Sequence, residues 1–430
     1  MSSKRTLENT ISLVLVQLVN LTLPLIALPY LARILGADSL GNIVFAMALA
    51  QIFLILSDYG FNLSAAKDVA LNRDDLAKTF NIWSSVTIIR SILACIGFII
   101  LVILIFIFDR LSENMWLYLL AYISVIGNVI YPQWLFQGLE QLKFVSFIQI
   151  ICRILLFSLL ILFVKSEVDI YFAIVIQSAG GLIAGLIVLP KIYKIFKDCK
   201  KVLPSINDLK NQLKSGWVIF IPNIFGNLYL SCNAFFLGLI VSPAQVANYH
   251  VAEKLIRAAV SVCSPISNAI FPKMVRMFQN SSNEALLLSM KIIIILLTIF
   301  LAGSLFTYFS AEYFVDLIFG KDFIQAGLLL KIFSPLPVLV VLAIVLGNLI
   351  MIPAGMEKYF SKIIMIASVL NIFIFLIFTH LFNNIGAVVA NLFVEIVVVS
   401  SMLYVLIRKN INPFNFWKLA LNDMLKKVIK

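Results

Sequence analysis

The chain has 430 residues, of which 62% are hydrophobic and 13% charged, and its formal net charge is +12. Soluble domains are roughly half apolar and a quarter charged, so this composition excludes an ordinary soluble domain and indicates an integral membrane protein. A basic chain can bind nucleic acid, but membrane proteins concentrate lysine and arginine in cytoplasmic loops, and we therefore expect no nucleic-acid partner.

Twelve segments are long and apolar enough to cross a bilayer, since a helix needs roughly 20 mainly apolar residues to do so. The sequence therefore predicts an all-α integral membrane protein with twelve transmembrane helices in two six-helix lobes. In chain order, the predicted spans are 11–32, 39–64, 80–108, 115–137, 144–164, 169–190, 216–241, 246–272, 286–309, 328–354, 360–380 and 384–407.

A lysine-rich segment divides the predicted spans six and six. The predicted domains are an N-terminal lobe (1–190), a basic cytoplasmic linker (191–215), a C-terminal lobe (216–407) and a basic cytoplasmic tail (408–430). Because each lobe would begin and end on the same side, the lobes would be related by a pseudo-two-fold axis along the membrane normal. Faint similarity of Gly41–Ala46 to Ala247–Ala252, and of Gly138–Phe144 to Gly355–Phe360, favours such a duplication.

The distribution of basic residues predicts the orientation. Lysines and arginines near the ends of spans tend to remain in the cytoplasm. An even number of spans places both termini on one side, and a cytoplasmic N-terminus puts most of the 33 basic residues on the inner face. The first apolar stretch lacks a small-x-small cleavage site, so we expect it to stay as an uncleaved helix.

Sequence signatures of catalysis are missing from the chain. We find no P-loop, no G-x-S-x-G and no H-E-x-x-H, and the predicted outer loops are short. The two histidines and five cysteines are scattered, without a C-x-x-C pair. We therefore expect no catalytic residues, no cofactor, no metal site and no disulfide, and a protein that is not an enzyme.

Seven charged residues are predicted to lie in the interior of the membrane and not at its faces. A charge at mid-bilayer costs at least ~2.5–3.5 kcal/mol on insertion scales, so such residues usually face a cavity or a partner. Four are basic and come from both lobes, so a shared central cleft would be cationic and would suit an anionic substrate such as a phosphate group. The predicted substrate-binding residues are Arg90, Arg153, Lys254 and Arg257. The predicted coupling or gating residues are Asp58, Glu253 and Glu395.

Structural roles for these charges stay open. Glu253 and Arg257 are four apart and could simply neutralise each other. Asp58 lies near the end of a span and could cap it or pair with Lys67. The two arginines of the first lobe could snorkel to the interface. Only Glu395 lacks a nearby partner in the sequence, which favours a protonatable or cation-binding carboxylate.

Amide side chains within the spans form a second polar set. They could hydrogen-bond sugars, although bridging between helices is the simpler interpretation for each one alone. These residues are Asn20, Asn128, Gln133, Gln137, Asn223 and Asn227.

Several strings in the chain match one family. Leu28–Gly36 (LPYLARILG), Gly41 and Asp58–Ala65 (DYGFNLSA) resemble the start of bacterial O-antigen flippases of the Wzx type. These are polysaccharide transporters of the multidrug/oligosaccharidyl-lipid/polysaccharide exporter superfamily. Further similar strings are Tyr131–Gly138 in the fourth span, Ala252–Ala258 in the eighth and Ser334–Pro337 in the tenth. The resemblance runs from about residue 7 to 407 and leaves out the basic tail.

The resemblance implies a function in lipopolysaccharide biosynthesis. Such proteins translocate undecaprenyl-diphosphate-linked O-antigen repeat units from the inner to the outer leaflet of the bacterial inner membrane. They act by alternating access, with a gradient of H+ or Na+ as the expected driving force. The implied partners are the undecaprenyl-diphosphate-linked oligosaccharide, membrane lipids, an O-antigen polymerase and a chain-length regulator.

Two other functions remain as alternatives. A multidrug or cation antiporter of the same superfamily would favour an acid-rich cavity. The charged residues predicted within the membrane here carry a net positive charge. A membrane enzyme acting on prenyl-linked sugars would need an aqueous catalytic site, for which the chain offers neither a motif nor a large loop.

Overall fold

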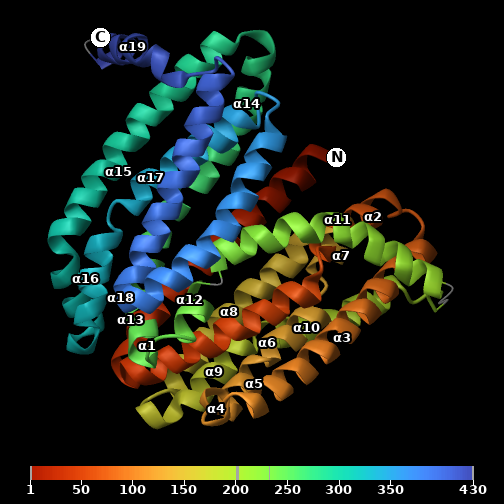
Figure 1. Ribbon diagram of the computed structural model, residues 1–430. Helices are drawn as coiled ribbons and strands as arrows, with labels where there is room; N and C mark the ends of the chain where they lie inside the picture. Colours follow the sequence, from red (N-terminus) through yellow and green to blue (C-terminus); the bar gives the residue numbers. More distant parts are fainter. Residues whose placement is uncertain (1, 200–202, 232, 429–430) are drawn as a thin grey trace. The chain divides into compact units, whose positions relative to one another are not determined.

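Figure 1 shows the protein as a computed structural model, which describes residues 2–199, 203–231 and 233–428. The side chains of residues 2–18, 20–21, 222–223, 225–231, 425 and 427–428 lie outside this description. The described residues form helices and turns without a strand, which confirms the predicted all-α class. By its internal contacts the chain separates into two compact units, Met1–Asn227 and Leu228–Lys430.

The first unit is a bundle that runs from α1 to most of α11. Its helices are α1 (Ser2–Asp58), α2 (Phe61–Leu71), α3 (Leu76–Ile107), α4 (Asp109–Ser112), α5 (Met115–Ala121), α6 (Ile123–Ile130), α7 (Gln133–Gly138), α8 (Leu142–Phe163), η1 (Glu167–Asp169), α9 (Ile170–Ser178), α10 (Gly180–Ile195) and α11 (Ile206–Ser231). Helix α1 packs against α3, α5, α6 and α8, while α6 packs against α10.

A glycine breaks the long first helix. Gly36 has φ 72° and ψ 176°, a left-handed conformation that glycine adopts without the steric penalty of a Cβ. The break falls between the predicted spans 11–32 and 39–64. Helix α1 therefore consists of two helical segments joined at Gly36.

The core of the first unit is built from large side chains that meet between α2, α3, α7, α8 and α10. Trp134 and Phe136 of α7 are 1% and 0% exposed, and Phe61 of α2 and Phe196 after α10 belong to the same cluster. The first part of α11 packs on this unit as well. There the ring of Phe220 stacks on Tyr59 with centroids 4.8 Å apart.

The region predicted as a linker, residues 191–215, is helical at both ends, and its described residues 196–199 and 203–205 form turns and irregular chain between them. It covers the end of α10 and the first turns of α11, and its residues 200–202 lie outside the described part. The boundary between the two compact units falls within α11, between Asn227 and Leu228.

The second unit contains one π-helix and several long helices. Its elements are α12 (Asn233–Gly238), α13 (Pro243–Ser261), α14 (Cys263–Asn280), α15 (Ser282–Phe319), η2 (Lys321–Phe323), α16 (Ile324–Phe333), α17 (Leu336–Ile344), the π-helix η3 (Val345–Met351), α18 (Glu357–Arg408), η4 (Pro413–Phe416) and α19 (Trp417–Val428). Non-helical angles at Phe382 and Asn383 break α18 between the predicted spans 360–380 and 384–407.

The basic tail, which matched no family string, forms a helix on this unit. Helix α19 packs against α15, and its Ala420 is fully buried in the core cluster of α14, α15 and α17. Lys291 of α15 lies 2.8 Å (Nζ to Oδ2) from Asp423. The tail is therefore part of the second unit.

Within the described residues, eight helices or helix runs are long and apolar enough to span a membrane. The number rises to nine if Lys321–Phe333 and Leu336–Met351, which are bent by 47° relative to each other, form one span. Two of the eight, Thr22–Leu71 and Glu357–Arg408, contain the breaks described above and each cover two predicted spans.

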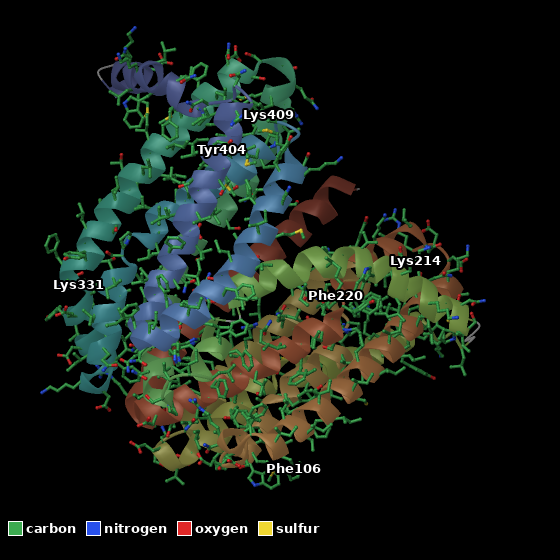
Figure 2. All side chains as sticks on the ribbon, viewed as in Figure 1. Phe106, Lys214, Phe220, Lys331, Tyr404 and Lys409 are labelled. Atoms are coloured by element: carbon green, nitrogen blue, oxygen red, sulfur yellow. The ribbon has the colours of Figure 1, made fainter. Side chains whose placement is uncertain are left out.

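The outer surfaces of these helices fit a lipid environment. Helix α3 exposes a run of isoleucine and phenylalanine side chains, among them Phe106 at 79% exposure (Figure 2). In the second unit, the guanidinium of Arg408 lies over Tyr404 and the ammonium of Lys409 over Tyr359, at 5.2 and 5.4 Å from the ring centroids. Aromatic and basic side chains of this kind anchor helix ends at membrane interfaces.

Candidate functional site

Arg90 and Asp58 form an ion pair inside the first unit. The Arg90 side chain on α3 is 1% exposed, and its Nη2 lies 3.5 Å from Oδ1 of Asp58 at the end of α1. Neither Oδ1 of Asp58 nor any nitrogen of the guanidinium has a hydrogen-bond partner among the described residues. The charges therefore compensate each other electrostatically, with unused hydrogen-bonding capacity around them.

This pair settles two alternatives left open by the sequence. The structure gives Asp58 an ion-pair partner, Arg90, that differs from Lys67, the one considered from the sequence. Arg90 is buried in the protein and does not snorkel to an interface, so that alternative is wrong for this residue. A buried ion pair costs desolvation energy and is weak evidence for stability alone. Its position in the unit keeps both residues as candidates for a functional role.

Glu253 and Arg257 form an ion pair on α13 in the second unit. Nε and Nη2 of Arg257 each lie 2.9 Å from Oε1 of Glu253, which is the expected spacing of residues four apart on a helix. The Glu253 side chain is 10% exposed and that of Arg257 38%. The neighbouring Lys254 is exposed on the same helix, while Glu395 is buried on α18 at 6% exposure. The face of α13 thus keeps a basic character.

A hydrogen-bonded cluster of asparagines lies in the same unit. Asn371 donates to Asn233 over 3.1 Å, Asn233 donates to Asn391 over 3.0 Å, and Asn391 donates to the hydroxyl of Tyr249 over 2.8 Å. These side chains come from α12, α13 and both halves of α18, so the cluster ties three helices together. Buried amides need such partners because an unpaired one costs free energy.

Arg153 has a different environment from the other basic residues. It lies on α8, is half-buried and borders a cavity of about 410 Å³ within the first unit. Asn128 and Gln133, two of the amides noted in the sequence, border the same cavity together with Gln149 and Gln177. The side chains of Asn20, Asn223 and Asn227 lie outside the described residues.

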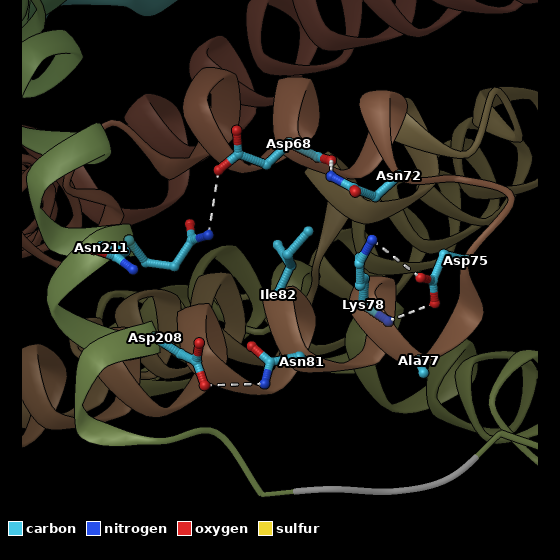
Figure 3. Close-up of a pocket in the computed structure, with 10 residues that line it drawn as sticks. Asp68, Asn72, Asp75, Ala77, Lys78, Asn81, Ile82, Asp208 and Asn211 are labelled. Carbon is cyan, nitrogen blue, oxygen red and sulfur yellow. Dashed lines mark hydrogen bonds and ion pairs between the residues drawn. The ribbon is translucent and has the colours of Figure 1, made fainter.

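A second pocket, of about 520 Å³, opens where α11 begins (Figure 3). Asn81 of α3 donates to Asp208 of α11 over 3.2 Å, and Gln212 of α11 donates to Asp68 of α2 over 3.2 Å. The backbone and hydroxyl of Ser205 also donate to Asp208, and these bonds hold the pKa of its carboxyl below the usual 3.8. The contacts fasten the first turns of α11 to α2 and α3.

The sequence signals found the charged residues and suggested the pair of Glu253 and Arg257, but they did not show that Arg90 pairs with Asp58. The ion pair of Arg90 and Asp58 joins residues on different helices, and the asparagine cluster joins segments far apart in the chain. Gln149 and Gln177 could have been noticed as polar residues in otherwise apolar spans. Among the described residues, no group of three or more His, Cys, Asp or Glu side chains is placed to hold a metal ion.

The fold defines the class of protein. A structure of the lipid II flippase MurJ in an inward closed conformation matches with TM-score 0.69 and 15% identity, over 97% of this chain and 90% of MurJ. An inward-facing multidrug resistance MATE family transporter of the MOP superfamily matches with TM-score 0.60 and 16% identity, over 91% of this chain and 94% of the other. The protein therefore has the fold of multi-pass membrane transporters.

Sequence comparison identifies the family. Residues 6–278 match the family described as "Polysaccharide biosynthesis protein". A protein of Escherichia coli (strain K12) named "Putative O-antigen transporter" is 32% identical over 399 residues, 92% of this chain and 95% of the relative. A relative of the same name in Shigella dysenteriae is 27% identical over 402 residues, 92% of this chain and 98% of the relative. The chain belongs to the polysaccharide biosynthesis protein family, as its motifs predicted, and is a membrane transporter, not an enzyme.

Proposed function

We propose that this protein is a flippase that moves undecaprenyl-diphosphate-linked O-antigen repeat units from the inner to the outer leaflet of the bacterial inner membrane. The observation that carries the proposal is the near full-length relationship to proteins named O-antigen transporters, at 32% identity over 92% of this chain. The fold shared with a lipid II flippase supports the same class of activity. A lipid-linked diphosphate cannot cross hydrocarbon unaided, because burying its charge is costly.

The basic residues of both units supply the proposed binding groups. Arg90, Arg153, Lys254 and Arg257 would neutralise the diphosphate or acidic sugars while the prenyl chain stays in lipid. Arg257 keeps 38% of its side chain exposed although it pairs with Glu253, so it can contact a substrate without giving up that partner. Arg90 is fully enclosed, and its contribution would require a rearrangement of its pair with Asp58.

Alternating access would be carried by twelve spans in two six-helix lobes. The breaks at Gly36 and at Phe382–Asn383 each divide one long helix into two segments of span length. The bent run α16–α17–η3 and helix α11 would supply two further spans. Both termini would then lie in the cytoplasm, as the distribution of basic residues predicts.

Ion coupling would use the acidic residues that are predicted to lie within the membrane. Asp58, Glu253 and Glu395 are buried or nearly so, and burial of a carboxylate is costly unless it is paired, protonated or bound to a cation. A gradient of H+ or Na+ is the proposed driving force. An O-antigen polymerase and a chain-length regulator are the proposed partners that act on the translocated product.

The test is surface O-antigen in a strain that lacks its own transporter. Wild-type protein should restore the polymer, and Arg257→Ala at matched expression should reduce it, because the substitution removes a partly exposed cation. Arg73→Gln is the matched control, since Arg73 forms an exposed ion pair with Glu140 outside the predicted spans. No restoration by the wild-type protein would contradict the function, and unchanged polymer with Arg257→Ala would remove that residue from the binding set.

A further inference from the structure

Five helices of the first unit surround the cavity beside Arg153. Residues of α1, α6, α8, α9 and α10 line it, with Tyr131 and Gln133 at the junction of α6 and α7. Its volume of about 410 Å³ lies within the range of ~300–1,000 Å³ that small-molecule sites occupy. The cavity is therefore large enough for a ligand and not only for a few waters.

Glycines shape one wall of this cavity. Gly180 and Gly181 of α10 line it without side chains. A Cβ added at Gly127 of α6 would overlap the backbone of Gly181 and Leu182, so α6 and α10 can approach this closely because Gly127 has no side chain. The two helices form a tight wall, and the free volume lies between that wall, α1 and α8.

The polar groups that border the cavity have unused hydrogen-bonding capacity. Arg153 makes no ion pair or hydrogen bond with the described residues, and Nδ2 of Asn128 is a buried donor without a partner there. Gln133, Gln149 and Gln177 add three more carboxamides. Three hydroxyls of the lining are already engaged: Tyr131 donates to the carbonyl of Val145, Ser124 to the carbonyl of Ala121 and Ser178 to the sulfur of Met47. Unpaired buried donors cost free energy, which a ligand with matching groups would recover.

The charge of the cavity indicates what such a ligand carries. Arg153 is the one basic residue in the described lining, and no carboxylate accompanies it. A diphosphate spreads more than one negative charge over several oxygens and calls for more than one cation. A single guanidinium matches a single carboxylate, which it binds through two parallel hydrogen bonds. Four carboxamides, which can both donate and accept, suit a ring bearing several hydroxyls.

We propose that this cavity is a subsite for one acidic sugar of the lipid-linked repeat unit, a hexuronic acid or a sugar of the same chemistry. Arg153 pairs with the carboxylate, and Asn128, Gln149 and Gln177 hydrogen-bond the ring hydroxyls. Apolar side chains, among them Pro24, Leu156 and Phe157, form the rest of the lining. The subsite deepens the proposed function and rests on it for the source of the sugar, but the binding chemistry can be measured without transport.

The first test measures the binding of free sugars to the purified full-length protein in detergent. Saturation-transfer NMR reports this binding. Sodium galacturonate should bind about tenfold more tightly than galactose, because a charge-assisted pair adds to the neutral hydrogen bonds. Arg153→Gln should remove this preference while galactose still binds, and Gln177→Leu should weaken both sugars. Arg73→Gln should match the wild-type protein. Inorganic pyrophosphate should not displace galacturonate.

Two results of that experiment would overturn the subsite. One is equal binding of galacturonate by the wild-type protein and by Arg153→Gln. The other is displacement of galacturonate by pyrophosphate at a lower concentration than galactose requires, which would assign Arg153 to the diphosphate.

A cell experiment separates the subsite from the proposed function. A transporter-null strain is supplied with two repeat units that differ only in one position, a hexuronate or the corresponding hexose. Wild-type protein should export both, and Arg153→Gln should lose the hexuronate unit selectively. Equal export of both by the variant contradicts the subsite alone. Export of neither by the wild-type protein contradicts the proposed function, and the sugar-binding measurement then decides the subsite.

Discussion

The guanidinium of Arg90 on α3 lies 3.5 Å (Nη2 to Oδ1) from the carboxylate of Asp58 at the end of α1, with the arginine side chain 1% and the aspartate 17% exposed. Removing one member of a buried ion pair leaves an uncompensated charge. We expect Arg90→Met and Asp58→Asn each to destabilise the protein by about 3–5 kcal/mol. The double variant should lose much less than the sum of the two.

Thermal unfolding in detergent, followed by fluorescence-detected size exclusion, measures this coupling as a double-mutant cycle. If the effects of the two substitutions simply add, the residues do not interact and the pairing is wrong.

A second prediction concerns the contact between α2 and α7. A Cβ at Gly138 would lie 2.6 Å from Cβ of Val69 and 2.7 Å from the carbonyl oxygen of Ala66. Gly138→Ala should therefore overpack the contact and cost about 1–3 kcal/mol of stability. Gly303→Ala on α15 is the matched control, because nothing lies within 4 Å of its added Cβ. Midpoints of thermal unfolding should fall for the first variant and not for the second; the reverse order would argue against this packing.

The asparagine cluster gives a third prediction. Tyr249→Phe removes one acceptor, but Asn391 keeps its hydrogen bond to the carbonyl of Ala387 at 2.9 Å, so the loss should be about 0.5–1.5 kcal/mol. Asn391→Leu instead leaves Nδ2 of Asn233 without its acceptor. Because a buried unpaired donor carries the full desolvation cost, the second loss should be the larger, at about 1–3 kcal/mol. Equal unfolding midpoints for Tyr249→Phe and Asn391→Leu would contradict the extra cost that we assign to the unpaired donor of Asn233.

A fourth prediction follows from the N-terminus of α11. The amide of Asp208 donates to the Ser205 hydroxyl, and the Ser205 amide donates back to the Asp208 carboxylate, as in a capping box. These bonds and the one from Asn81 hold the pKa of Asp208 below 3.8 in the folded protein. The stabilisation is therefore complete above pH 3.8 and is lost as the pH falls through the lower folded value.

Hydrogen exchange of the peptide that contains Asp208 tests this, with rates corrected for intrinsic pH dependence. Protection of the first turn of α11 should be constant near neutral pH and fall in acid. Asp208→Asn should show weaker protection and less of this acid dependence. An unchanged acid profile in the variant would assign the effect to other carboxyls.

The sequence predicts much of this architecture because an apolar run of span length is explained mainly as a helix that crosses the bilayer. The breaks at Gly36 and at Phe382–Asn383 fall in the gaps between predicted spans. The sequence also identified Arg153 and Asn128 as polar residues in apolar helices. It could not show that they border one cavity, because that depends on how α6 and α8 pack.

The partners of the charged residues were harder to predict. Glu253 and Arg257 are neighbours on one helix, so their spacing alone suggested the observed pair. Asp58 instead pairs with Arg90 on a different helix, and not with Lys67, which is nearer in the sequence. Residues 408–430 were expected as a basic cytoplasmic tail whose role the sequence left open; in the structure Ala420 is buried and Asp423 pairs with Lys291. Long-range packing decides such contacts, and local spacing does not encode it.

The central claim is that this protein moves a lipid-linked oligosaccharide between leaflets. Its most direct test is purified protein reconstituted into vesicles that carry undecaprenyl-diphosphate-linked oligosaccharide, with a membrane-impermeant lectin reporting the sugar on the outer leaflet. We predict that sugar becomes accessible faster than in protein-free vesicles, and that Arg257→Ala slows this while Arg73→Gln does not. Equal accessibility with and without folded wild-type protein, under an imposed H+ or Na+ gradient of either direction, would contradict the account.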